Sequence, residues 1–138
     1  MSLTDYSDLE QEIKNAPEPK VLSAGSEVYA RIISVRSGVS DTNDCTWHMP
    51  TFDVPDDPMV IEFNKFMWEL DRDHLEPKKF ARALSDFQKF ATCFGLDYSR
   101  PFSWEDDLVG LEGWVILGIQ KDPEYGDKNT IKRFVVRQ

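Results

Sequence analysis

Aromatic and basic side chains are interleaved along the segments of this sequence that have strand-like patterns. Aromatic rings stack on exposed nucleobases, and nearby lysine or arginine side chains neutralise phosphates; neither contact requires a particular base. The residue types therefore indicate binding of a single-stranded nucleic acid rather than a chemical reaction. The candidate binding residues are Tyr29, Arg31, Arg36, Trp47, Phe52, Lys65, Tyr125, Lys128, Lys132 and Arg133.

Four of these residues have the clearest expected positions. Arg31 and Lys132 lie on the first and last strand segments, which we expect to come close together in a closed barrel, so that their charges act on one phosphate backbone. Trp47 and Tyr125 have polar, loop-like neighbours, where we expect exposed rings at the rims of a groove. Periodicity instead predicts core positions for Trp68, Phe80, Phe87, Phe94, Trp114 and Phe134.

Catalytic and metal-binding arrangements are not indicated. His48 and His74 are far apart, as are Cys45 and Cys93, so neither pair has the short spacing of a preformed metal site. We expect both histidines to be exposed or hydrogen-bonded loop residues, and Cys93 to be a small buried residue. The sequence has no glycine-framed serine and no phosphate-binding glycine loop. We therefore expect a protein that is not an enzyme and holds no metal and no cofactor.

Charge and composition argue against several further classes. The formal net charge of −9 at pH 7 opposes capture of duplex DNA or of an anionic membrane surface by charge alone. Residues 121–138 nevertheless carry five bases against three acids, which predicts a local basic strip. No apolar run approaches the roughly 20 residues of a membrane span, and the first residues lack the features of a signal peptide. We therefore expect a cytoplasmic protein with no membrane partner.

The chain is predicted to begin with an arm, followed by one domain with a single core. Residues 1–24 contain an acidic stretch with the pattern of a short helix. Pro17 and Pro19 stop this helix, because proline lacks an amide donor and restricts its predecessor. The remainder, residues 25–138, is long enough to bury a core without disulfides.

Strand signals dominate the first half of that domain. The β-branched run 27–36 predicts the first strand, in which the doubled Ile32-Ile33 indicates either two buried faces or a bulge. Pro50 restricts the extended segment 46–52 to an edge or a loop. Two further segments fit either two short strands or one bent strand: residues 59–63 and 66–70.

The pattern then changes to a helical period, with apolar residues at steps of four and three: Phe80, Leu84, Phe87, Ala91 and Phe94. This spacing predicts a helix over residues 76–94, with Pro77 in its first turn and Gly95 at its end. Segments 113–119 and 130–136 predict a closing hairpin. The order predicts a mainly β protein with the OB-fold, a five-stranded barrel with one amphipathic helix inserted before the last two strands.

The chain resembles the phage-encoded single-stranded-DNA-binding proteins with an OB-fold. The resemblance is carried, in this order, by YSDL at 6–9, SAGS at 23–26, FQKFATCFGLD at 87–97, GLEGW at 110–114 and YGDKNTIKRF at 125–134. It implies sequence-independent binding of single-stranded DNA during phage DNA replication or recombination. It also implies a location in the cytoplasm of the host cell, with replication or recombination proteins as further partners.

The negative charge favours an alternative function, an acidic protein-interaction module or DNA-mimicking inhibitor with an OB-like barrel. The paired acids at 56–57 and 105–107 leave a metal-dependent nuclease as a third and weaker hypothesis. A homodimer is compatible with the short exposed edges of a small barrel.

Overall fold

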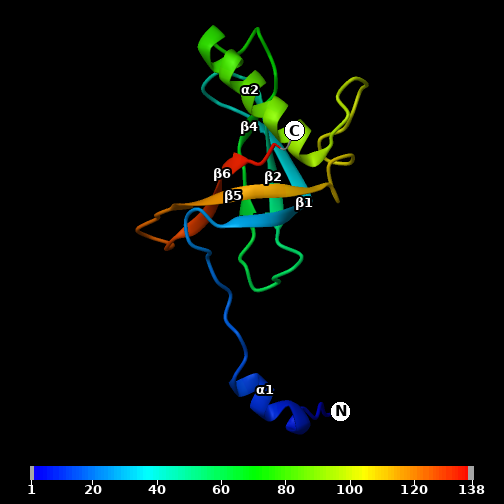
Figure 1. Ribbon diagram of the computed structural model, residues 1–138, viewed down its shortest axis with the longest axis vertical. Coiled ribbons are helices and arrows are strands. Elements are labelled where there is room, and N and C mark those ends of the chain that lie inside the picture. Colours follow the sequence, from blue (N-terminus) through cyan, green and yellow to red (C-terminus); the bar gives the residue numbers. More distant parts are fainter. Residues whose placement is uncertain (1, 137–138) are drawn as a thin grey trace.

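The computed structural model describes residues 2–136. Figure 1 shows a body with a sheet and one long helix, α2 (Pro77–Phe94), and an N-terminal segment that extends from the end of the body opposite α2. This segment, residues 2–19, is called the arm below; it carries a 3-10 turn, η1 (Ser7–Leu9), and the short helix α1 (Glu10–Lys14). The predicted acidic helix is thus present, and every residue of the arm is exposed.

The body is built around one antiparallel sheet. Its strands are β1 (Glu27–Val39), β2 (Thr46–Asp53), β3 (Phe63–Asn64), β4 (Met67–Trp68), β5 (Glu112–Gln120) and β6 (Lys128–Phe134). The order is β3-β2-β1-β5-β6, with β4 also paired to β2, so the protein is mainly β as predicted. β3 also lies alongside β6, with Cα atoms within 8 Å, although among the described residues no hydrogen-bonded ladder joins these two strands.

A bulge bends the long strand β1. The register between β1 and β2 shifts between Ile32 and Ser34, which places Ile33 in the bulge. Ile32 is fully buried, whereas Ile33 is partly exposed. Of the two sequence interpretations, the bulge is therefore confirmed, and it turns the end of β1 that pairs with β2 away from the end that pairs with β5.

Pro50 lies inside the sheet, so its predicted place at an edge or in a loop is wrong. β2 pairs with β1 on one side and with β3 and β4 on the other. The carbonyl of Pro50 accepts a hydrogen bond from the Lys65 amide. The amide position and carbonyl of one strand residue point to the same side, so the missing donor of Pro50 faces Lys65 and Phe66, where β3 and β4 are interrupted. Of the two alternatives for segments 59–63 and 66–70, two short strands are present, and each is only two residues long.

α2 is buried only along its C-terminal half, through Phe87, Phe90, Ala91 and Phe94. Gly95 ends the helix with a left-handed φ of 69°, as predicted. Phe80 is partly exposed and Leu84 is 42% exposed, contrary to the predicted apolar face, because the N-terminal half of α2 extends past the sheet (Figure 1). Among residues 2–136, no helix has the length and apolar character needed to cross a membrane.

Phe90 occupies the centre of the core. Its ring is fully buried, and its centroid lies 5.3 Å from that of Phe94, 5.5 Å from that of Phe134 and 6.1 Å from that of Trp104. These partners come from α2, from β6 and from the segment between α2 and β5. Aromatic contacts with β6 and with the segment between α2 and β5 therefore hold the helix to the body.

Three residues predicted to be buried are more exposed than expected. Trp114 on β5 is 40% exposed and packs against Tyr29, and Trp68 on β4 is partly exposed. Cys93 is also only partly buried, and its thiol donates a hydrogen bond to the carbonyl of Trp114. Trp104 takes a core position instead, because the segment after α2 folds back over the sheet.

Phe90→Ala is expected to lower the free energy of unfolding by about 3–5 kcal/mol, since it removes a fully buried ring and leaves a cavity. Leu84→Ala is the control on the same helix, because Leu84 is 42% exposed; we expect a change within about 0.5 kcal/mol. Urea denaturation followed by circular dichroism measures both. Similar losses for the two variants would show that both halves of α2 are equally buried.

Candidate functional site

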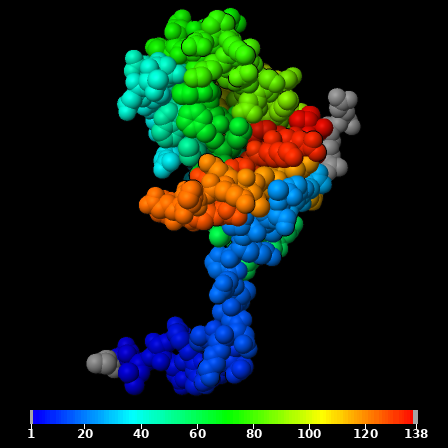
Figure 2. Space-filling model, turned by 90° about the vertical axis from the view of Figure 1, so that its left-hand side faces the viewer, coloured from blue at the N-terminus to red at the C-terminus, as the bar shows by residue number. Residues whose placement is uncertain are grey.

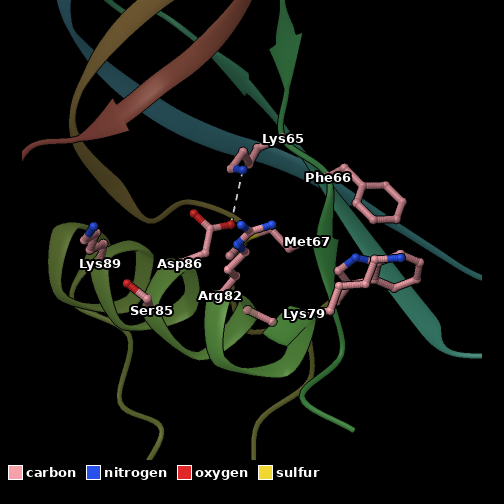
Figure 3. A pocket seen from close by; sticks show the side chains of 10 residues that line it. Lys65, Phe66, Met67, Lys79, Arg82, Ser85, Asp86 and Lys89 are labelled. Atoms are coloured by element: carbon pink, nitrogen blue, oxygen red, sulfur yellow. Dashed lines mark ion pairs between the residues drawn. The ribbon is translucent and has the colours of Figure 1, made fainter. Parts of the chain in front are cut away.

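A cleft of about 450 Å³ separates the N-terminal half of α2 from the chain segment that carries β4. Figure 3 shows side chains from both elements lining it. We call it the β4–α2 cleft. Its lining combines aromatic with basic side chains, chiefly Phe66, Trp68, Lys65, Lys79, Arg82 and Lys89.

Three rings, Trp47, Phe66 and Trp68, form an aromatic ladder on the sheet side of this cleft. The centroid of Phe66 lies 5.8 Å from that of Trp47 and 4.8 Å from that of Trp68. A cation covers each end, with the Arg36 guanidinium 5.8 Å from the Trp47 centroid and the Lys79 ammonium 5.7 Å from the Trp68 centroid. Phe66 is 40% exposed. The middle of the ladder therefore presents ring surface to which a flat ligand can bind.

Strand register places the two tryptophans on one face. Trp47 on β2 lies opposite Gly38 on β1 and opposite Trp68 on β4, and directly opposed residues of paired strands point to the same face. Gly38 provides the space for the indole, because a Cβ atom at this position would lie 2.5 Å from Cζ2 of Trp47. The ring of Trp47 can therefore lie across β1 only because residue 38 has no side chain.

α2 contributes a row of basic side chains to the opposite wall. Lys79, Arg82 and Lys89 share one face of the helix, as their spacing requires. Asp86 belongs to the same face and forms an ion pair with Lys65 at 3.2 Å, drawn in Figure 3. The cleft thus combines four cations with one carboxylate, a local positive charge in a chain whose net charge is −9.

His48 holds β2 from inside the body, so its predicted loop position is wrong, although its predicted hydrogen bonding is present. The imidazole is buried, hydrogen-bonded at Nδ1 to Ser37 Oγ at 2.7 Å and paired at Nε2 with Glu69. Its ring stacks on that of Trp104 with centroids 4.2 Å apart. Because successive strand residues point to opposite faces, the inward position of His48 turns Trp47 outward.

Ser37, His48 and Glu69 are the residue types of a hydrolytic triad, and the sequence gives no sign that they meet. In their observed geometry, the Ser37 hydroxyl does not donate its hydrogen bond to His48. The Ser37 hydroxyl donates a hydrogen bond to Glu105 at 2.6 Å, which lowers the pKa of that carboxyl. Because the Ser37 hydroxyl donates its hydrogen bond to Glu105 and the imidazole stacks on Trp104, this group links β1, β2 and the segments beside them.

Phe52 is wrongly predicted as a binding residue. Its ring is fully buried, with centroids 5.7 Å from Phe63 and 5.6 Å from Phe94. A buried ring cannot offer its face to a nucleobase. The strand alternation that exposes Thr51 and Asp53 in part directs Phe52 into the core.

Arg31 and Tyr29 lie on β1 and are engaged by neighbours on the adjacent strands. Asp53 binds the Arg31 guanidinium through both oxygens, at 2.7 and 3.1 Å, and Tyr29 packs against Trp114. In the sheet, β5 lies between β1, which carries Arg31, and β6, which carries Lys132. The positive charge of Arg31 is therefore balanced locally and separated from that of Lys132.

The other predicted residues fall in two places. Arg36, Trp47 and Lys65 lie at the ladder and the β4–α2 cleft. The β5–β6 hairpin, whose turn projects from the body in Figure 2 (orange), carries the remaining four, all exposed: Tyr125, Lys128, Lys132 and Arg133. The structure therefore brings three of the ten candidates together at the ladder and cleft and places four others on the hairpin.

Sequence reasoning misses five of the eight residues of the ladder, its two covering cations and the basic walls of the cleft. Phe66 is not singled out, Trp68 is assigned to the core, and Lys79, Arg82 and Lys89 are visible only as the polar face of a helix. The spacing of these basic residues gives the one sequence signal. Their position opposite the aromatic side chains of β4 results from tertiary packing, which the local sequence does not show.

Comparisons with known proteins add no family assignment. No protein-family model matches the chain, and no curated protein matches it. Within residues 2–136, no three histidine, cysteine, aspartate or glutamate side chains come together in a group that could hold a metal ion. The geometry and charge of the cleft are therefore the basis on which a function is assigned.

Gly38→Ala is expected to displace the Trp47 ring, because the added Cβ atom would overlap it. Overpacking of this kind costs about 1–3 kcal/mol, so the free energy of unfolding should fall by that amount and tryptophan emission should shift. Ser34→Ala, at an exposed position of the same strand, is the control. Unchanged stability and emission for Gly38→Ala would show that the indole is not seated on Gly38.

Proposed function

We propose that this chain binds single-stranded DNA without sequence preference. Bases stack on the aromatic ladder, and phosphates of the same strand contact the cations of α2 across the cleft. The observation that carries the proposal is the ladder itself, three adjacent rings with a cation at each end.

The chemistry favours a single strand over a duplex. Stacking on a protein ring needs an accessible base face, which a duplex hides within its own stack, and such stacking contributes about 1–3 kcal/mol per base. The net charge of −9 repels DNA at long range, so binding depends on short-range contacts within the cleft. No base-specific hydrogen bond is needed, which makes the surface tolerant of sequence.

The proposal includes closure of the sheet as an OB-type barrel. β1 lies between β2 and β5, and the strands at the two ends of the order, β3 and β6, lie alongside each other. Pairing of β3 with β6 completes a five-stranded barrel with α2 before its last two strands. In this proposal the protein is not an enzyme and covers strands exposed during phage DNA replication or recombination in the host cytoplasm, with replication or recombination proteins as further partners.

The acidic charge outside the cleft supports one competing function, an interaction module that docks onto a basic protein or imitates DNA. The two functions differ in their ligand. Strand binding requires that oligo(dT) quench tryptophan emission and that salt reverse the effect. An acidic module leaves the emission unchanged when oligo(dT) is added.

Arg82→Glu is expected to weaken binding of labelled oligo(dT) by about tenfold at about 50 mM salt, because it removes a cation that binds phosphate and adds a like charge. The slope of log K against log salt should become shallower by about 0.7 for each phosphate that is no longer neutralised. Lys121→Glu makes the same change in net charge at an exposed position between β5 and β6. Fluorescence anisotropy measures both variants, and equal losses of affinity would assign binding to overall charge instead of the cleft.

Phe66→Ala is expected to reduce the free energy of binding by about 1–3 kcal/mol, the contribution of one stacked base. Its thermal stability should change little, since the ring is 40% exposed. Tyr125→Ala, which removes an 82% exposed ring from the hairpin turn, is measured beside it. Weaker binding by both variants would extend the binding surface to the hairpin, and weaker binding by Tyr125→Ala alone would move the site there.

A further inference from the structure

The arm carries apolar side chains that its own chain leaves exposed. Leu9 and Ile13 lie one helical turn apart and are 40% and 55% exposed, and Tyr6 before them is 61% exposed. Acidic residues alternate with them, at Asp8 and Glu12 among others. An exposed helix with one apolar and one acidic side has the character of a ligand for a groove that is apolar in its floor and basic at its rim.

The structure contains a groove of this kind in the body. It encloses about 810 Å³ between α2 and the end of β6, and we call it the β6 groove. Ile116 and Val136 supply apolar surface beside the buried ring of Phe134, and Lys89, Arg133 and Glu27 supply two positive charges and one negative charge. Lys89 also lines the β4–α2 cleft. Val136 is 41% exposed. The lining of two cations and one carboxylate is net positive, and it therefore complements an arm in which acidic residues outnumber basic ones.

The root of the arm is fixed to the body beside residues 57–61, outside the lining of that groove. Lys20 forms a parallel bridge with Val60, with hydrogen bonds of 2.8 Å to the Met59 carbonyl and 2.9 Å from the Ile61 amide, and its ammonium pairs with Asp57 at 2.7 Å. From this anchor the arm extends away from the body, whereas the end of β6 (red) lies against α2 in the upper part of Figure 2. The arm thus points outward from its own chain.

We propose that the arm of one copy docks into the β6 groove of a second copy. Because the arm and the groove lie on different parts of the molecule, the contact is heterologous, and each bound copy still offers one free arm and one free groove. Copies therefore associate head to tail. If the protein binds DNA as proposed above, such a row would place successive copies along one DNA strand and make binding cooperative. This consequence rests on the proposed function, whereas the docking contact does not.

Self-association without DNA tests the contact directly. Sedimentation velocity of the full chain at low salt should show larger species with an apparent Kd on the order of 10–100 µM, because one short helix buries less area than a stable interface. Leu9→Asp should weaken this association by at least about tenfold. Val109→Asp is the matched control, since Val109 is 48% exposed in the body, and it should associate as the unaltered chain does.

Mixing two variants tests which surfaces meet. Leu9→Asp retains its groove, and Arg133→Glu retains its arm, so neither should associate alone while their mixture should form a dimer and nothing larger. A chain that stays monomeric across this concentration range overturns the proposal, whether its arm is free or folded back. Association of Leu9→Asp that is as strong as that of the unaltered chain also overturns the proposal. A mixture of the two variants that remains monomeric overturns it as well.

A separate measurement distinguishes failure of docking from failure of strand binding. An oligo(dT) that holds one copy should bind Leu9→Asp and the unaltered chain with equal affinity, whereas long poly(dT) should bind Leu9→Asp with reduced cooperativity. Association without any oligo(dT) binding overturns the proposed function and leaves the docking contact standing. Equal cooperativity for both proteins on poly(dT) overturns the head-to-tail row on DNA.

Discussion

Burial of the aromatic face of α2 is the constraint on which the arrangement of this molecule depends. The sheet packs against only the half of the helix that carries Phe87, Phe90 and Phe94. The other half is a continuation of the same rigid element beyond the sheet, and it holds Lys79 and Arg82 opposite β4. Packing in the core therefore sets the width of a cleft whose basic wall makes few core contacts of its own.

The aromatic wall is set by a second interior contact. His48 points inward to Ser37, Glu69 and Trp104, and its neighbour Trp47 points outward over Gly38. A slip of one residue in the pairing of β2 would exchange the two, placing an indole inside and an imidazole at the cleft. The polar contacts of the histidine oppose that slip, because they are satisfied in one register only.

Local patterns predict most of the elements, and tertiary pairing decides most of the site. The helix end at Gly95, the bulge beside Ile33 and the closing hairpin each depend on a few adjacent residues, so the sequence is sufficient to find them. The position of Pro50 is predicted wrongly, because a proline fits inside the sheet here only where the neighbouring strand is interrupted at Lys65, and Lys65 is distant in sequence. The pairing of Arg31 with Asp53 likewise depends on cross-strand register, which no local pattern contains.

The beginning of α2 is where the local rules of helix stability are broken. Its first turn contains Lys78 and Lys79 and no acidic residue, although the partial positive charge of a helix N-terminus disfavours each cation there by about 0.3–1 kcal/mol. Within residues 2–136, no carboxylate lies within ion-pair distance of Lys79, Arg82 or Lys89. The helix dipole and unpaired cations therefore add to one positive field over the cleft. The first turn thus lowers helix stability while it adds positive charge beside the cleft, and conflicts of this kind are expected at functional sites.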